Sequence, residues 1–302
     1  MEVFDTTILI LDAFRPDNFF HIYNKQGKLL KSFGNKGRGP GELLTVSNFH
    51  PNKQNNTITV YNSQKRHIIE YDIQKILHNV SPFYSEYPIE LSTIYPQEII
   101  KLDSNNYLCC HRLPQLRYSI KEDNEEKFQY TKYPQVEERN IPAFTAAILN
   151  YAGQYRLSPD HTKFLEVSYI GAIMDLFKIE KNKMIPIKTR LIYYPYYKVI
   201  DELNAQITWD DATKIGFECI YTTNSHIYSL LNGIIGYELK NPNIQEPYTK
   251  NISIFDWEGN PKTLIQTDHM MNALCLDEAE QIIYALAYNK GEHALVKISL
   301  KK

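Results

Sequence analysis

Short stretches of alternating apolar and polar residues run along most of the chain, and each is followed by a polar turn. Two examples are "FFHIYNKQGKLLKSF" near the start and "ISIFDWEGNPKTLI" near the end. Alternation with a period of two places successive side chains on opposite faces of a β-strand. The 23 tyrosines and 13 phenylalanines, beside only 12 glycines, favour strands further because aromatic side chains suit a pleated surface. The sequence therefore predicts an all-β protein.

The alternating unit recurs six times, at an average spacing of about 55 residues. Each interval holds two further predicted strands, as "TITVYN" precedes "HIIEYDIQKIL" and "HIYSLL" precedes "ISIFDWEGNPKTLI". In "HIIEYDIQKIL" the outer strand is expected to begin at Lys75 or a neighbour. Four strands per unit are typical of a β-propeller, whose radial packing buries both faces of each sheet. We therefore expect a six-bladed β-propeller with four-stranded antiparallel blades, in a single domain over residues 1–302. The third strand of each blade is predicted near Phe20–Asn24, Ile68–Tyr71, Tyr118–Glu122, Asp175–Glu180, Ile252–Asp256 and Ala294–Ser299.

The two ends of the sequence predict an incomplete last blade. "MEVFD" matches the innermost strand of blade one, and "HALVKISLKK" supplies the third strand of blade six. Because no residues follow for a fourth strand, blade six is expected to have three. One explanation is a shortened start, with a closing strand and an export signal encoded upstream. The alternative is a cytoplasmic form that tolerates an open sheet edge.

The stretch "GNKGRGPGEL", residues Gly34–Leu43, has the glycine content of a phosphate-binding loop. Such a loop would lead into a helix whose N-terminus faces the anion, but no helical periodicity follows here. The stretch lies where the outer strand of blade one crosses to the inner strand of blade two. We interpret it as a structural connection, in which glycine permits positive φ and proline fixes one torsion. The residues assigned to it are Gly37, Arg38, Gly39, Pro40, Gly41 and Glu42.

This part of the chain also resembles a known family. The segment "FHIYNKQGKLLKSFGNKGRGPGEL" is similar to the hallmark of the TolB-like six-bladed β-propeller proteins found widely in Bacteroidetes, which are related in pattern to NHL-repeat propellers. The likeness is specific at Gly37–Glu42 and extends loosely over the whole chain, although later blades lack the Gly-Pro-Gly-Glu signature. It implies a six-bladed fold, often in a periplasmic or cell-envelope protein, and mostly an unassigned function.

Charge and apolar content exclude some classes of partner. The 33 basic and 35 acidic side chains leave a formal charge of −2, which gives no long-range attraction to nucleic acid or anionic lipid. No apolar run approaches the roughly 18 to 20 residues that span a bilayer. The N-terminus as written also lacks the features of a signal peptide. We therefore expect no nucleic-acid partner and no transmembrane segment.

The cysteines suggest no metal site. Cys109 and Cys110 are adjacent and are expected on opposite faces of a strand, and no zinc-binding spacing is present. We expect all four cysteines to be reduced, buried thiols. A disulfide between distant strands is the alternative.

The sequence contains no compact catalytic motif of the common kinds. There is no zinc-protease helix motif, no G-x-S-x-G elbow and no EF-hand loop. His50, His111 and His161 fall at predicted strand ends, where a hydrogen-bonded imidazole is the simpler interpretation. Six-bladed lactonases and related hydrolases bind calcium with ligands dispersed across blades, an arrangement that dispersed residues here leave open. No cofactor is predicted. Calcium is the one ion whose binding the sequence leaves open.

Length is concentrated in the predicted loops of one face. Crossings such as "YYPYYKVIDELNAQITWDDATK" are long, whereas turns at the opposite end, such as "WEGN", are minimal. Long loops without a packing role are often binding loops, and flat aromatic groups beside acceptors suit a sugar or peptide. Packing of the aromatic groups at the channel mouth is the alternative. The candidates are Tyr194, Tyr196, Trp209 and Asp210.

Two further features belong to this predicted face. Ile200, Leu203 and Ile207 fall at helical spacing, so a short helix is expected there. Three arginines, each predicted in a loop between the second and third strands of a blade, could converge on a carboxylate, sulfate or phosphate, unless they are solvated surface groups. They are Arg15, Arg66 and Arg112.

These observations favour a non-catalytic binding or interaction module that uses the loop-rich face for a carbohydrate, a peptide or a protein partner. The alternative is a calcium-assisted hydrolase or lyase of the six-bladed lactonase type.

Overall fold

The structure is a computed structural model of the 302-residue chain. It describes residues 1–14, 17–91, 96–123, 125–129, 132–134, 146–147, 153–194, 197–201, 205–207, 213–235, 248–289 and 292–301. The chain divides into two compact units. The first comprises Met1–His111 and Tyr118–Phe128, and the second comprises Arg112–Arg117 and Gln129–Lys302. A single domain over the whole chain remains a prediction.

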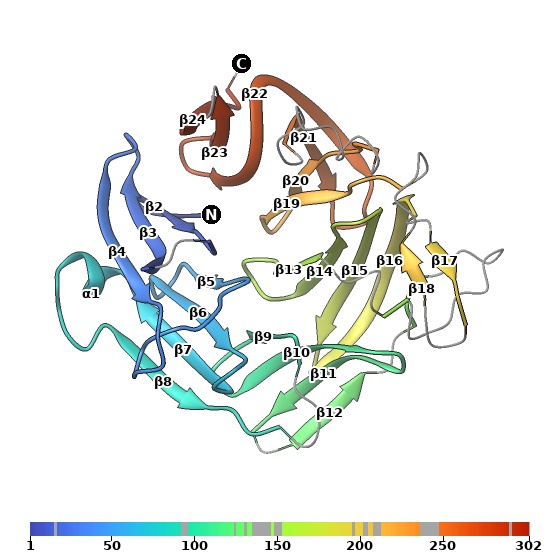
Figure 1. Ribbon diagram of the computed structural model, residues 1–302, viewed down its shortest axis with the longest axis horizontal. Coiled ribbons are helices and arrows are strands. Elements are labelled where there is room, and N and C mark those ends of the chain that lie inside the picture. The colour runs from blue at the N-terminus through green and yellow to red at the C-terminus, as the bar shows by residue number, and fades with distance from the viewer. Residues whose placement is uncertain are drawn as a thin grey trace. The chain divides into compact units, whose positions relative to one another are not determined.

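Strands make up nearly all the regular structure of the first unit. The first sheet contains β1 (Glu2–Phe4), β2 (Thr7–Leu11), β3 (Asn18–Asn24) and β4 (Leu29–Asn35), in that order (Figure 1). The second contains β5 (His50–Asn52), β6 (Thr57–Asn62), β7 (His67–Asp72) and β8 (Tyr84–Pro88). The third contains β9 (Glu98–Lys101), β10 (Asn106–Leu113), β11 (Leu116–Glu122) and β12 (Glu125–Gln129). β10 to β12 run across the boundaries between the two units.

The second unit continues the same pattern. Its first sheet contains β13 (Gly153–Leu157), β14 (Lys163–Ser168), β15 (Ala172–Glu180) and β16 (Lys183–Tyr193). A six-stranded sheet follows, with β19 (Phe217–Thr222), β20 (His226–Leu231), β21 (Thr249–Asp256), β22 (Pro261–Asp277), β23 (Ile282–Asn289) and β24 (Glu292–Ser299). All the pairings between neighbouring strands of this sheet are antiparallel.

The alternating pattern located the strands correctly. Four of the predicted third strands lie within the third strand of a four-stranded sheet, namely β3, β7, β11 or β15. The other two lie within the six-stranded sheet, one in its third strand, β21, and one in its last strand, β24. The predicted second strands "TITVYN" and "HIYSLL" coincide with β6 and β20. β1 pairs with β2, as expected for an innermost strand.

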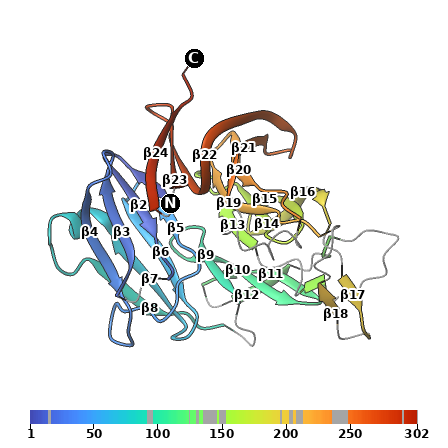
Figure 2. The ribbon, with the colours of Figure 1, turned by 45° about the horizontal axis from the view of Figure 1, so that its top comes forward.

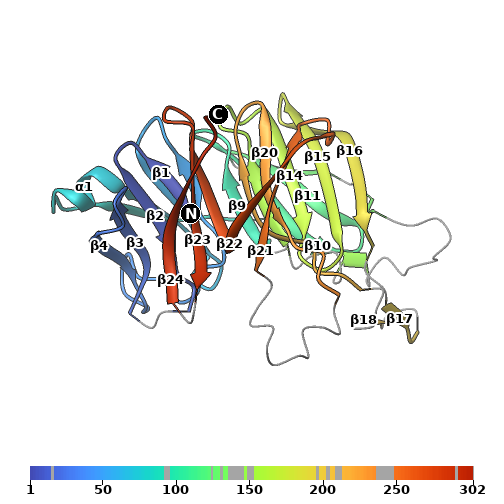
Figure 3. The same cartoon turned by 90° about the horizontal axis from the view of Figure 1, so that it is seen from above.

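β22 joins two groups of strands as one continuous strand of 17 residues. Its first part pairs with β21 and its second part with β23, and Met271 has a partner in each. Figures 1, 2 and 3 show β22 running from β21 to β23 without a break. The sequence predicted two separate strands here. The strand continues because "PKTLIQTDHMMNALCLD" contains no glycine and no proline after Pro261 that would interrupt it.

β24 is largely exposed, although it occupies the position that was predicted for the third strand of blade six. Its residues are exposed or half-buried throughout, whereas the third strands of the four-stranded sheets are largely buried. Within the described residues, no strand pairs with its outer edge. β22 to β24 end the six-stranded sheet, and a sixth blade of three strands remains a prediction.

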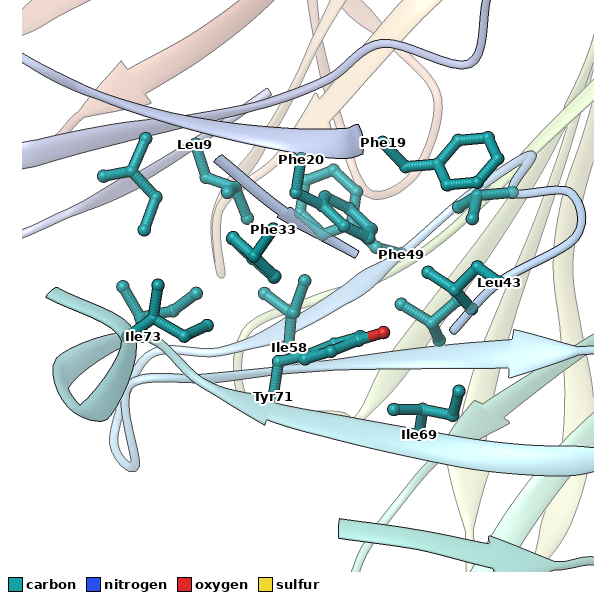
Figure 4. Packing of buried hydrophobic residues seen from close by; sticks show 14 of the residues in the cluster. Leu9, Phe19, Phe20, Phe33, Leu43, Phe49, Ile58, Ile69, Tyr71 and Ile73 are labelled. Carbon is teal, nitrogen blue, oxygen red and sulfur yellow. The ribbon is translucent and has the colours of Figure 1, made fainter. Parts of the chain in front are cut away.

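Apolar side chains on both faces explain why the second sheet is buried. Ile58 of β6 packs in a cluster with Phe20 and Phe33 of the first sheet (Figure 4). Val60 of β6 belongs to the same cluster. Tyr61, on the opposite face, packs in a cluster with residues of the third sheet. Phe20 and Phe33 stack with ring centroids 5.1 Å apart, and Tyr71 meets Phe33 edge-on at 5.2 Å. Such pairs stabilise a core beyond their buried area.

The second unit has an apolar core and a buried ion network. Leu165 and Met174 pack against Phe217 and Phe255, which join the sheet of β13–β16 to the six-stranded sheet. Arg117, also in this unit, is almost fully buried.

Two carboxylates surround the Arg117 guanidinium. Its Nη1 donates to Asp175 Oδ2 at 2.6 Å, and its Nη2 donates to Glu166 Oε2 at 2.8 Å. The ring of Tyr133 lies 5.1 Å from its central carbon. Buried charges of this kind depend on every partner remaining in place.

Two predictions about local structure are wrong. The second copy of the repeat has a short helix, α1 (Ile73–Leu77), where an outer strand was expected from Lys75, and that strand is β8 instead. The helix begins there because the Asp72 side chain caps it by accepting the Lys75 N–H. The helix expected around Ile200 and Ile207 is a pair of strands, β17 (Tyr197–Val199) and β18 (Ala205–Ile207). Val199 and Ile200 are β-branched, which favours extended backbone.

All four cysteines are buried and free, as predicted. The five-residue α1 is far too short to cross a bilayer. In the part of the chain that the structure describes, no helix is both long enough and apolar enough to do so.

Candidate ligand-binding site

The loop Gly37–Glu42 folds back on itself between β4 and β5. Gly37 N–H donates to Leu43 O at 2.9 Å, and Glu42 N–H donates to Gly39 O at 3.1 Å. The Glu42 side chain turns inward, and its Oε2 accepts the Gly39 N–H at 2.7 Å. The loop therefore satisfies much of its own backbone and has a defined shape.

Two glycines are required by contacts rather than by composition. A β-carbon on Gly37 would overlap the Glu42 carboxylate. Gly41 has a φ of 70°, and a β-carbon there would meet the Tyr84 ring at 2.5 Å. Glycine has neither obstacle because it has no β-carbon. The ring of Tyr84 consequently lies directly against the loop backbone.

Lys65 fastens the loop to the turn that precedes β7. Its Nζ donates to Gly39 O at 2.5 Å and to Glu42 O at 3.0 Å, and it lies 3.4 Å from Glu86 Oε1. Tyr71 adds a hydrogen bond from its hydroxyl to Gly41 O at 2.8 Å. The charge of Lys65 is therefore already engaged within the protein.

Glu86, on β8, connects the loop to a histidine. Its Oε2 accepts the Gly41 N–H at 2.7 Å, and its Oε1 lies 2.8 Å from His67 Nδ1. Burial acts to raise the pKa of Glu86, but the hydrogen bonds from Gly41 and His67 and the charge of Lys65 outweigh it and hold the pKa below its usual value. Because the carboxylate is ionised, His67 donates from Nδ1. With Nδ1 as the donor, a neutral imidazole has its lone pair on Nε2.

These residues surround an open cavity with a volume of about 690 Å³, within the range typical of small-molecule sites. The cavity combines apolar walls with polar and charged groups. Its lining residues are Arg38, Pro40, Leu44, Gln64, Lys65, His67, Tyr84 and Glu86. All of them lie in the first unit.

Arg38 stands out within this lining. Its side chain is exposed, and it makes no hydrogen bond or ion pair with the part of the chain that the structure describes. Lys65, by contrast, has three partners. Arg38 is therefore the permanent cation of the cavity that is available to a ligand.

A serine, a histidine and a glutamate also meet elsewhere in the first unit, but in a different order from a catalytic triad. His111 Nε2 lies 2.8 Å from Ser119 Oγ, which donates to Glu126 Oε1 at 2.5 Å. Activation of the serine as a nucleophile requires its hydroxyl proton to be directed to the imidazole. Here the proton is directed to the carboxylate instead. The His111 and Glu126 side chains are 0% and 4% exposed. This arrangement is a buried network of the core.

The site residues predicted from the loop-rich face are mostly not described. Arg15, Tyr196, Trp209 and Asp210 lie outside the described residues.

The other three predicted residues are located individually. Arg66 lies in the turn between β6 and β7, as predicted, with a φ of 61°. Arg112 was expected in a loop but lies on β10, which continues to Leu113 because no glycine or proline interrupts "NYLCCHRL". Tyr194 donates its hydroxyl to Pro134 O at 3.3 Å. Convergence of the three arginines remains a prediction.

The sequence did not identify Lys65, His67, Tyr84 and Glu86 as neighbours of the glycine-rich loop. No motif links them, because they contact the loop from up to 45 residues away. The nearest signal was the loop itself, whose glycines indicate close backbone approach. Within the described residues, no three His, Cys, Asp or Glu side chains gather as a metal site would require. Calcium binding by the long loops remains untested.

Comparison with known proteins agrees with the architecture. A model of the TolB-like 6-blade propeller-like family matches residues 1–279. The chain belongs to this family. The all-β propeller fold and the TolB-like resemblance are thereby confirmed, while the relation to NHL-repeat propellers remains a prediction. A search of curated proteins gave no match.

Solved structures resemble this TolB-like chain in fold alone. A putative exported protein from Bacteroides fragilis is 14% identical, with a TM-score of 0.54, and the match covers 94% of this chain and 77% of the other. Hydrazine synthase from Kuenenia stuttgartiensis is 11% identical, with a TM-score of 0.49 and coverage of 99% and 95%. The β-propeller domain of Cps50 from Myceliophteria thermophila is 8% identical, with a TM-score of 0.43 and coverage of 99% of each chain.

Proposed function

We propose that the protein is a non-catalytic binding module whose small carbohydrate or peptide ligand occupies the cavity beside the Gly37–Glu42 loop. The observation that carries the proposal is the lining of the cavity. An unpartnered cation, Arg38, lies with the His67–Glu86 pair and the apolar walls of Pro40 and Leu44. A few polar groups on an apolar surface are what a small-molecule site requires.

Three features support binding in preference to catalysis. The lining includes no serine, threonine or cysteine that could serve as a nucleophile. Lys65 and Glu86 each hold the loop in place, so their hydrogen-bonding groups are engaged. The loop is fastened at several points, which preorganises the cavity wall and reduces the entropy lost on binding.

The loop-rich face that the sequence predicts remains a second candidate surface. Tyr194, Tyr196, Trp209 and Asp210 would supply its aromatic groups and an acceptor. We also propose that β22 to β24 form the sixth blade of the propeller, with β22 serving as the outer strand of the fifth.

Binding tests can distinguish the two surfaces. Isothermal titration calorimetry with hits from a glycan and peptide panel would compare the wild type with Arg38→Ala and Arg112→Ala, both of which replace exposed arginines. We expect Arg38→Ala to weaken binding about 10-fold or more and Arg112→Ala to have little effect. The reverse result would place the ligand elsewhere. A tight calcium site together with lactone hydrolysis would favour the calcium-assisted hydrolase.

A further inference from the structure

The charges of the cavity indicate which ligand it suits. Two lysine or arginine side chains line it, and Lys65 is engaged with Gly39 O, Glu42 O and Glu86. Glu86 contributes a negative charge to the same wall. A ligand therefore meets one available guanidinium beside a fixed carboxylate. A single negative charge matches this setting, whereas a phosphate dianion would be repelled by Glu86.

The type of cation in the cavity indicates which anionic group a ligand should carry. A guanidinium presents a planar fork of N–H donors that matches a carboxylate in a bidentate arrangement. Arg38 is flanked by Gly37 and Gly39, whose backbone is held by Leu43 and by the Glu42 carboxylate. The base of the side chain is therefore fixed, while its head is free to meet the ligand.

The other polar groups call for hydroxyls. Both oxygens of Glu86 are occupied by Gly41, His67 and Lys65. His67 is one-third exposed and is held through Nδ1, so its Nε2 is directed away from Glu86 as an acceptor for an O–H donor. Gln64 and the Tyr84 hydroxyl make no hydrogen bond with the described residues and can exchange hydrogen bonds with further hydroxyls. A deprotonated carboxylate could not satisfy His67 Nε2, because both are acceptors.

The apolar walls complete the requirement. Pro40 and Leu44 lie on the loop side, and the Tyr84 ring lies against Gly41. A sugar ring presents C–H groups on its faces and hydroxyls around its edge, so it can pack on such walls while its edge is hydrogen-bonded.

We infer that the cavity binds a hexuronate, an acidic sugar whose carboxylate pairs with Arg38 and whose ring hydroxyls donate to His67 Nε2. This inference rests on the proposed binding function. It goes further than that function because it requires a negative charge on the ligand that pairs with the positive charge of Arg38.

The test compares sugars that differ in one group. The intact chain, labelled with ¹⁵N, is titrated with sodium galacturonate, methyl galacturonate ester, galactose and galactose 6-sulfate, and with acetyl-Ala-Ala as a peptide carboxylate. Amide shifts at Gly39, Gly41 and His67 locate binding at the cavity. We expect galacturonate to bind about 10-fold or more tightly than galactose or the ester. The ester comparison uses the wild-type protein and does not depend on whether a variant folds.

Variants then test the pairing. Arg38→Gln is expected to weaken galacturonate binding about 10-fold or more and to weaken galactose binding by a clearly smaller factor. Because Arg38 is exposed and unpartnered in the described structure, this variant should keep the melting temperature of the wild type. Arg112→Gln, which replaces an exposed arginine in β10, should leave both affinities unchanged.

The results that would contradict the hexuronate inference differ from those that would contradict the proposed binding function. Equal binding of galactose and galacturonate at these amides would overturn the hexuronate inference and leave the binding function intact. Preference for the sulfated sugar or the peptide would also overturn it. If none of the five compounds shifts these amides, both the inference and the carbohydrate or peptide function of the cavity are wrong.

Discussion

The Glu86 carboxylate accepts the backbone N–H of Gly41 at 2.7 Å, across 45 residues of sequence. The same carboxylate receives His67 through its other oxygen. One side chain therefore sets both the position of the loop and the tautomer of the histidine in the cavity. Changes at Glu86 should affect the fold of the loop and the chemistry of the cavity together.

Glu86→Gln should lower the free energy of unfolding at pH 7 by about 1 kcal/mol, because the amide can still accept from Gly41 but has no charge to pair with Lys65. The pKa of Glu86 is lower in the folded protein than its usual 4.5. The stabilisation is therefore complete above about pH 5 and is lost as the pH falls through the folded pKa.

Urea unfolding of wild type and variant between pH 3 and 7 measures this difference, and the other acidic groups cancel in the comparison. The two curves should converge as the pH falls through the folded pKa of Glu86. A constant gap over the whole range would show that the charge of Glu86 contributes nothing.

Gly37→Ala should destabilise the protein by about 1–3 kcal/mol, because the new methyl group would displace the Glu42 carboxylate. Glu42→Ala should itself cost about 1 kcal/mol through the lost hydrogen bond to Gly39. In the Glu42→Ala background the clash is absent, so the added cost of Gly37→Ala should fall below about 1 kcal/mol. A double-mutant cycle by chemical denaturation measures this coupling. Additive effects would mean that the two side chains do not compete for the same space.

Arg117→Met should cost about 3–5 kcal/mol, because it leaves Glu166 and Asp175 buried without their cation. Lys178→Met is the matched control in the same unit. Lys178 pairs with Glu180, and both side chains are about half exposed, so its loss should cost less than about 1 kcal/mol. Thermal unfolding of the two variants provides the comparison. Similar costs would contradict a special role for the buried network.

Lys262→Met should raise the pKa of Asp256. Burial acts to raise this pKa, but Lys262 and the backbone and side chain of Asn260 donate hydrogen bonds that lower it to about 2, from a usual 3.8. Removing the lysine should return the pKa towards 3.8 but not fully, because Asn260 and the Glu258 N–H still donate.

NMR titration of the Asp256 carboxyl carbon measures this shift directly, with Lys250→Met as a control on the preceding strand. A pKa that stays at about 2 in the Lys262 variant would assign the effect to the turn backbone alone.

The strands were predictable because their signal is local. "TITVYN" and "HIYSLL" have apolar side chains on both faces of a strand, and both sequences correspond to β6 and β20. α1 was not predicted, since its five residues carry too little periodicity and depend on capping by Asp72. The helix expected at Ile200 shows the opposite error, because helical spacing between apolar residues was taken as a helix where Ile207 lies in a strand, β18, that pairs with β17.

The cavity was less predictable than the fold. The loop motif was recognised, but its partners lie in β7, in β8 and in the turn before β7, and they are joined to it by hydrogen bonds between residues far apart in the sequence. Pairs such as Lys65 and Gly39, or Glu86 and Gly41, leave no shared pattern in a single sequence. The same glycines could serve either to pack the loop or to line a cavity. The sequence alone could not distinguish these two roles.

The continuity of β22 limits how this part of the protein can change in length. A connection between two other sheets can absorb an inserted residue, because only its own turns would adjust. β22 offers less slack, because Met271 is registered with Thr249 on one side and with Ala287 on the other, and the pairing on both sides already shifts register beside it. An inserted residue would shift the side chains of one half to the wrong face unless a bulge absorbed it. Insertions and deletions among relatives should therefore avoid Pro261–Asp277 and accumulate in the connections that separate the other sheets.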